Sequence, residues 1–209
     1  MAKVKIGNVF PPLAWLMERC APAGYGLGSV GGYDTWNGDA NALTKQGWYR
    51  LESGTTNGVG SSASLRVDGY TETGLTQTAY TRTGFIVQRA CVDGLWSEWE
   101  WENPPMLAGM EYRITERWNG KPVYTALVDC GACVSPSMEI ATELTCGQII
   151  RHCGTVSAHS MPSINATLDN AWSVWAMVTN SDGRVKITVY SGTGMATEHA
   201  YVQVWYTKS

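Results

Sequence analysis

Hydrophobic and polar residues alternate along most of this chain in short runs, which is the pattern of β-strands. The clearest case is the segment 184–189, where Val185, Ile187 and Val189 alternate with polar side chains and predict a strand with one buried face. Similar runs recur at the spacing expected of all-β proteins. They predict strands at 48–51, 65–67, 75–80, 85–89, 96–101, 148–153, 155–159, 171–179, 184–190 and 200–207. The predicted fold class is all-β.

Turn signals separate several of these runs. Asn119-Gly120 lies between strand-like runs at 111–118 and 121–128, and Asn-Gly in that position is the strongest short-range signal of a β-hairpin. Asp93-Gly94 and Ser181-Asp182-Gly183 predict two further tight turns.

The pattern of residues changes twice along the chain, which divides it into three segments. Residues 1–32 predict a leader and linker with one or two helical turns at 13–19. Residues 33–103 predict a small β domain that includes a short helix at 39–46. Residues 104–209 predict a β-sandwich, jelly-roll-like, at the C-terminal end. A length of 209 residues suits two such domains, because one immunoglobulin-sized sandwich needs only about 100.

Composition favours a binding protein. Charged residues are 16% of the chain, and ten Trp and ten Tyr stand against two Phe, so the aromatic residues used are those suited to wet interfaces. The net charge of −3 argues against a nucleic-acid partner, which needs clustered positive charge. No apolar run reaches the roughly 18 residues of a membrane span, and the N-terminus lacks the apolar core of a signal peptide.

Tryptophan and glutamate alternate in one short segment. In an extended strand Trp99 and Trp101 share one face, while Glu98, Glu100 and Glu102 share the other. We expect the three glutamates to form a solvated stripe. The tryptophans are expected to be buried in contacts between subunits.

Six cysteines leave several interpretations open. They are Cys20, Cys91, Cys130, Cys133, Cys146 and Cys153. Four of them form a C-x2-C…C-x6-C pattern near His152 and His159, but a structural zinc site usually has tight spacing on both arms. We favour small buried residues, with disulfides and a metal site as alternatives, and predict no metal and no cofactor.

The first β domain resembles the knob domain of pyocin and bacteriophage tail fibres. The resemblance rests on Gly47-Trp48-Tyr49, Leu65-Arg66-Val67, Thr76-Gln77-Thr78, Gln88-Arg89 and the closing Gly94-Leu95-Trp96-Ser97-Glu98-Trp99. The segments 111–124 and 204–208 are similar to the tip modules that follow such knobs. The resemblance implies a virion tail protein made in the bacterial cytoplasm, a homotrimer, contact with other phage tail proteins, and a distal domain that binds a bacterial cell-surface glycan.

Candidate ligand-binding residues lie in the second half of the chain. An exposed aromatic ring can stack on a sugar while nearby polar groups complete the hydrogen bonds. The candidates are Trp172, Trp175, Tyr190, Trp205, Asn170 and His199, with the loops 160–170 and 191–199 as the best recognition loops. In the strand 200–207, Trp205 and Tyr201 are expected on the face opposite to Val202, Val204 and Tyr206. Burial of these aromatics between subunits is the alternative.

No catalytic residues are predicted. Glycan hydrolysis needs two carboxylates on opposite sides of a bond, and no nucleophile motif surrounds any Ser or Cys. The predicted function is therefore receptor binding without catalysis. The alternatives are a trimerisation or connector module with no ligand of its own and, less favoured, a glycan hydrolase.

Overall fold

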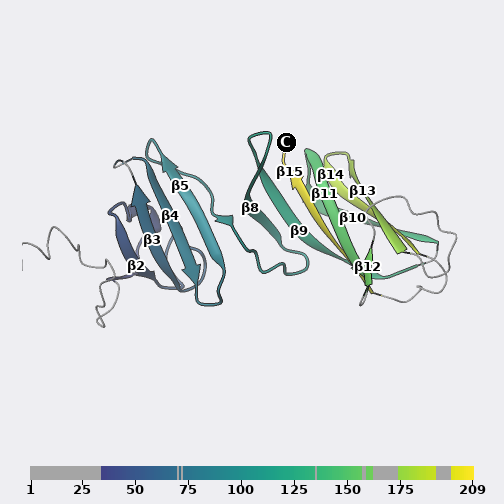
Figure 1. Cartoon of the computed structure of the whole chain (residues 1–209), viewed down its shortest axis with the longest axis horizontal. Helices are drawn as coiled ribbons and strands as arrows, with labels where there is room; N and C mark the ends of the chain where they lie inside the picture. Colours follow the sequence, from purple (N-terminus) through teal and green to yellow (C-terminus); the bar gives the residue numbers. More distant parts are fainter. Residues whose placement is uncertain are drawn as a thin grey trace, which may run out of the picture. The chain divides into compact units, whose positions relative to one another are not determined.

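A computed structural model describes residues 34–69, 71, 73–134, 136–156, 159–161, 174–191 and 199–209. The chain divides into two compact units, Met1–Trp99 and Glu100–Ser209. Both are built almost entirely of β-strands (Figure 1), which confirms the all-β class. The helical turns predicted at 13–19 lie outside the described residues.

The first unit contains one sheet in the order β1-β2-β3-β4-β5. Its elements are β1 (Asp34–Trp36), the 3-10 helix η2 (Ala40–Ala42), β2 (Gly47–Leu51), β3 (Ala63–Gly69), β4 (Leu75–Thr81), β5 (Ile86–Val92) and β6 (Leu95–Trp96). Strand β1 runs parallel to β2, the later neighbours are antiparallel, and β6 pairs with β5.

The helix predicted at 39–46 is a single turn. Asp39 is its N-cap, and the Asp39 side chain accepts a hydrogen bond from the backbone amide of Asn41 at 2.8 Å. The helix ends at Ala42. The amide of Gln77 donates to the carbonyls of Ala40 and Leu43 at 2.8 and 3.0 Å. A buried side chain from β4 thus satisfies groups that a longer helix would have paired, so the longer helix was a wrong prediction.

The same Gln77 anchors a buried polar stack in this unit. Arg89 donates to the Gln77 side-chain oxygen at 3.0 and 2.8 Å. The Arg89 guanidinium lies 4.6 Å from the ring centroid of Trp96 and 4.3 Å from that of Trp99. The two indoles also donate to backbone carbonyls, of Asn41 and Asn57 respectively. These tryptophans are therefore used for packing inside their own unit.

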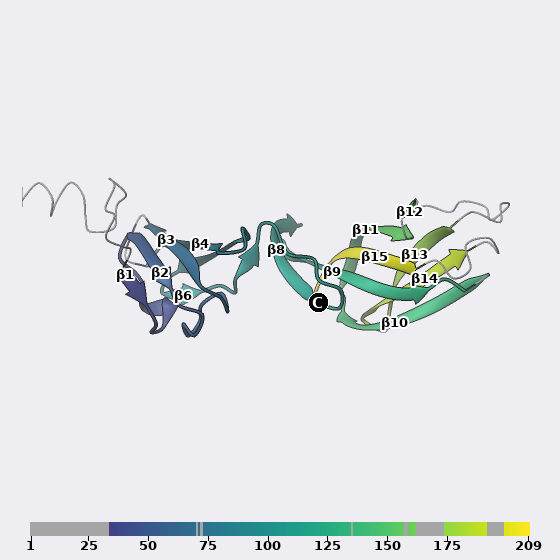
Figure 2. The ribbon, with the colours of Figure 1, turned by 90° about the horizontal axis from the view of Figure 1, so that it is seen from below.

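The second unit is built of two sheets, whose strands β8 to β15 are labelled at the right of Figure 2. The larger sheet has the order β7-β8-β9-β15-β11-β12, and the smaller has the order β10-β14-β13. The strands are β7 (Glu100–Trp101), β8 (Glu111–Trp118), β9 (Lys121–Ala132), β10 (Ser137–Thr145), β11 (Gln148–Val156), β12 (His159–Met161), β13 (Val174–Ser181), β14 (Arg184–Ser191) and β15 (His199–Thr207).

The core of the sandwich lies between these sheets. Strand β14 contributes Val185, Ile187 and Val189, as predicted from their alternation. Strand β15 contributes Val202, Val204 and Tyr206, which confirms that its other face is directed away from the core. Three cysteines complete this core: Cys130, Cys133 and Cys146.

None of the five described cysteines forms a disulfide bond. The interpretation as small buried residues is correct for Cys91, Cys130, Cys133 and Cys146, whereas Cys153 is exposed on β11. Burial, with smaller contributions from Asp129 and Cys133, raises the pKa of the Cys130 thiol to about 12. A thiol of this kind stays protonated at neutral pH and packs as an apolar group.

Three further expectations are corrected. Glu100 is only 5% exposed, because Arg113 and Arg117 bind its carboxylate at 2.7 to 2.9 Å, so it is no part of a solvated stripe. The strands predicted at 148–153 and 155–159 are largely one strand, β11, because the pairing with β15 continues through Gly154. Strand β10 has no counterpart among the predicted strands.

Candidate functional site

The candidate site lies on the face of the larger sheet that is turned away from the sandwich core. In the register of this sheet Arg151 on β11 is opposite Trp205 on β15, and Trp205 is opposite Thr125 on β9. Residues directly opposite each other in a β-ladder share a face. Three neighbouring strands therefore place a guanidinium, an indole and a hydroxyl in one row across the sheet.

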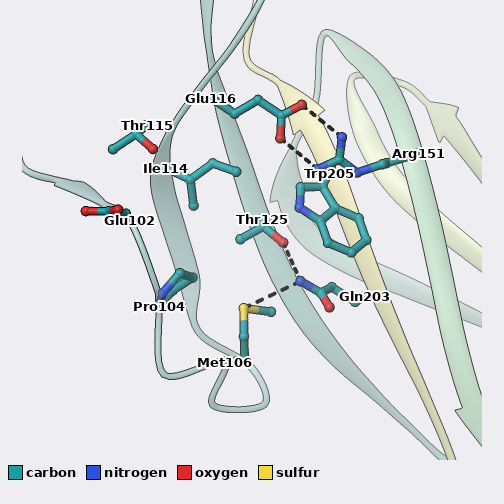
Figure 3. A pocket seen from close by; sticks show the side chains of 10 residues that line it. All are labelled: Glu102, Pro104, Met106, Ile114, Thr115, Glu116, Thr125, Arg151, Gln203 and Trp205. Atoms are coloured by element: carbon teal, nitrogen blue, oxygen red, sulfur yellow. Dashed lines mark hydrogen bonds and ion pairs between the residues drawn. The ribbon is translucent and has the colours of Figure 1, made fainter. Parts of the chain in front are cut away.

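A pocket of about 320 Å³ opens over this row (Figure 3). This volume is near the lower end of the range for small-ligand sites, about 300 to 1,000 Å³. The pocket is lined by Glu102, Pro104, Met106, Ile114, Thr115, Glu116, Thr125, Arg151, Gln203 and Trp205, all from the second unit. Apolar surface comes from the indole, the proline, the methionine and the isoleucine, and the polar groups surround it.

Trp205 is held in place from one side by Arg151. The guanidinium carbon lies 4.7 Å from the centroid of the indole. Two nitrogens of Arg151 bind the two carboxylate oxygens of Glu116 at 2.8 and 2.7 Å, as the dashed lines in Figure 3 show. A bidentate pair fixes the plane of a guanidinium better than a single contact does. The half-buried indole is thus pre-positioned at the pocket.

Gln203 and Thr125 supply the polar floor beside the indole. The Gln203 amide nitrogen donates to Thr125 Oγ1 at 3.2 Å and lies 3.6 Å from Met106 Sδ. Thr125 is buried, and its hydroxyl donates a hydrogen bond to the Val204 carbonyl at 3.0 Å. The amide oxygen of Gln203 accepts no hydrogen bond from the residues that the structure describes. This oxygen can accept a hydrogen bond from a further donor.

The predicted site residues are distributed over separate places. Trp205 lines the pocket. Tyr190 projects from the outer face of the smaller sheet, where the backbone of Trp175 is its cross-strand partner. His199 is on the Trp205 face of β15, but six residues away, or about 20 Å along a strand. Trp172 and Asn170 lie outside the described residues, as do most of the two predicted recognition loops.

His199 takes part in a separate polar contact. Its Nε2 lies 2.6 Å from Asp129 Oδ1, and its ring is 4.8 Å from that of Tyr201. A hydrogen bond from the Gly131 amide and the contact with His199 lower the pKa of Asp129 below its ordinary value. This pair fastens the start of β15 to the bulge in β9, away from the pocket.

Sequence reasoning missed the partners of Trp205. Arg151, Glu116, Thr125 and Gln203 come from four strands, and only the register of the sheet brings them together. For Gln203 a signal was available, since it lies two residues before Trp205 and so shares its face of the strand.

Stacking and hydrogen bonding are the chemistry that these side chains offer. No group of three or more potential metal ligands occurs among the described residues. Two carboxylates border the pocket, but both oxygens of Glu116 are bound to Arg151. In the part of the chain that the structure describes, no helix is long and apolar enough to cross a membrane.

Comparison with known proteins gives distant structural similarity only. No protein family model and no curated protein sequence matches the chain. Among solved structures, an N-truncated R2-type pyocin tail fibre is 9% identical with a TM-score of 0.32, covering 85% of this chain and 99% of its own. A C-terminal part of the R1 pyocin fibre of P. aeruginosa is 12% identical with a TM-score of 0.32, covering 85% of this chain and 68% of its own. Scores of this size do not define a shared fold.

Proposed function

We propose that this chain is a phage or phage-like tail protein whose second unit binds a bacterial cell-surface glycan without catalysis. The observation that carries the proposal is the Trp205 pocket, where a fixed indole borders a cavity of about 320 Å³ beside an oriented amide acceptor. The resemblance of sequence motifs in the first unit to tail-fibre knobs supports the proposal that the chain is a tail protein. After its synthesis in the bacterial cytoplasm, we place the protein in the virion tail, where it would meet bacterial surface sugars.

The indole suits a sugar ring. The C–H face of a pyranose packs on an aromatic plane, while its hydroxyl groups need directional polar partners. Trp205 supplies the plane, Gln203 supplies an acceptor beside it, and Arg151, whose guanidinium lies over the indole, supplies N–H donors. Because Arg151 and Glu116 already hold the indole, little side-chain freedom is lost on binding.

Weak binding at one pocket is sufficient for this role. A homotrimer, which we also propose, presents three copies, and several fibres on one particle multiply them again. Linked sites raise avidity by factors of about 10² to 10⁴ without new contacts.

The polar groups favour binding over hydrolysis. A glycosidase needs one carboxylic acid to protonate the leaving group and a second carboxylate as base or nucleophile. At this pocket Glu116 is held in a bidentate ion pair, which leaves Glu102 as the carboxylate available to a ligand.

Binding of the fluorescently labelled full-length chain to a panel of bacterial isolates tests the proposal. Trp205→Ala should lower cell binding by about tenfold or more, the size expected for a tryptophan at the centre of an interface. Trp118→Ala is the matched control, because that indole is 39% exposed at the end of β8 and does not line the pocket. Equal binding by both variants would contradict the site. Reducing sugar released from bound polysaccharide would instead support the hydrolase.

A connector module remains the second candidate, and exposed apolar side chains favour it. Val92 and Leu95 face each other across the Asp93-Gly94 turn and are 65% and 77% exposed. Neighbouring exposed apolar side chains can mark a surface that becomes buried on association. Sedimentation analysis of Leu95→Ser, together with cell binding of the unchanged chain, tests this candidate: loss of the oligomer in the variant and no cell binding by the unchanged chain would support the connector, whereas cell binding that depends on Trp205 would contradict it.

A further inference from the structure

Three ionisable side chains border the Trp205 pocket, and they are not equivalent. Arg151 and Glu116 neutralise each other through two hydrogen bonds of 2.8 and 2.7 Å. Glu102 is exposed at the rim and makes no ion pair or hydrogen bond with any residue that the structure describes. The pocket therefore carries one surplus negative charge.

Hydrogen-bond acceptors also predominate over free cationic groups. Gln203 directs its amide nitrogen to Thr125 and Met106, so its oxygen is the part left for a ligand. A carboxylate on a ligand would have to compete with Glu116 for Arg151, and it would meet the charge of Glu102. An ammonium, amide N–H or hydroxyl group would instead find two acceptors without a partner.

We propose that this pocket selects a neutral or amine-bearing sugar ring over an acidic one, with Glu102 as the residue that sets the selectivity. This inference rests on the proposed glycan-binding function and names the class of sugar at the same site. Trp205 contributes affinity for any ring with an apolar face. Glu102 repels a carboxylate and accepts from an ammonium or hydroxyl group.

The test measures affinities of the full-length chain for matched methyl glycosides by ligand-observed NMR. The probes are the methyl glycosides of glucose, glucosamine and glucuronic acid, with the same three substituents repeated in the galacto series. Within the series that binds, the order of affinity should be amine, then neutral, then acid. Each step should be about two- to five-fold, the size expected for one exposed charge, and should shrink at high salt.

Glu102→Gln should bring the affinities for the three rings of a series to within about two-fold of one another. Glu143→Gln is the matched control, because it makes the same change in net charge at a carboxylate that is 91% exposed on β10 in the other sheet. It should preserve the wild-type order.

The outcomes separate this inference from the proposed function. An acidic ring that binds as tightly as the neutral one, or an order unchanged in Glu102→Gln, overturns the selectivity but leaves glycan binding in place. Failure of all six glycosides to bind also overturns the selectivity. The proposed function itself is decided by the effect of Trp205→Ala on binding to cells.

Discussion

Arg151 connects the indole of Trp205 to the carboxylate of Glu116. Its guanidinium carbon is 4.7 Å from the ring centroid, and its two nitrogens meet the two oxygens of Glu116 at 2.8 and 2.7 Å. Trp205 is on β15, Arg151 is on β11 and Glu116 is on β8. In the sheet, β9 pairs with both β8 and β15, and β15 pairs with β11. The ring at the pocket is thus positioned by groups that are 35 residues apart in sequence.

The first prediction concerns this arrangement. Arg151→Lys keeps the charge but removes the planar fork, so the bidentate contact with Glu116 and the stacking on Trp205 are both lost. We expect glycan affinity to fall by about three- to ten-fold, with a change in the free energy of unfolding below about 1 kcal/mol. Titration with the tightest-binding methyl glycoside and urea denaturation measure the two quantities.

Arg184→Lys is the control for that substitution. Arg184 pairs with Glu143 on the smaller sheet, where its side chain is half exposed and distant from the pocket lining. Its replacement should leave glycan affinity unchanged. If Arg151→Lys also left affinity unchanged, the guanidinium would have no part in positioning the indole.

Local signals predicted much of the fold. Asn119 and Gly120 have φ of 49° and 77°, and Asp182 and Gly183 have 54° and 75°, the positive values that two-residue hairpin turns require. These residue pairs specify their own geometry, so each turn could be identified without knowledge of the rest of the chain. The alternation of buried and exposed residues in β14 and β15 is also a local property, so these strands could be predicted from their own sequences.

Strand β10 shows a signal that was present but not used. In its sequence Met138, Ile140 and Leu144 alternate with exposed positions, and the observed burial follows that alternation. The period of two along this strand was the informative property, and the cysteines on either side of it carried no information about the strand.

The site could not be predicted from local patterns, because it depends on pairing across strands. Glu100 appeared to be part of a solvated stripe because its neighbours alternate with tryptophans, yet the cations that make its burial tolerable lie 13 and 17 residues further on. Trp205 could be proposed as a ligand-binding residue, but its register against Arg151 could not be derived.

The second prediction concerns the buried carboxylate of Glu100. Glu100→Gln removes the buried negative charge that Arg113 and Arg117 both bind near the start of the second unit. Breaking a buried ion pair costs about 3 to 5 kcal/mol, and the partial exposure of Arg117 places the expected loss of unfolding free energy near the lower end of that range. Urea denaturation of the full-length chain measures it.

Glu139→Gln provides the comparison for Glu100→Gln. It breaks an exposed pair with Lys186 at 2.9 Å, and such a pair contributes about 0 to 1 kcal/mol. Similar losses in the two variants would mean that the Glu100 cluster is solvated and makes no special contribution.

The third prediction concerns the thiols. Burial raises the pKa of Cys130 to about 12, while Cys153 is exposed on β11, its pKa raised by partial burial with an opposing effect of Arg151. Since the thiolate is the reactive form, iodoacetamide at pH 8 should modify Cys153 before Cys91, Cys130, Cys133 or Cys146. Peptide mass spectrometry after timed labelling measures the order. The four buried thiols should react only as the chain unfolds, so their labelling should accelerate in urea and that of Cys153 should change little. Early modification of Cys130 in the folded chain would show that the sandwich core opens at the end of β9, and would contradict the close packing of that core.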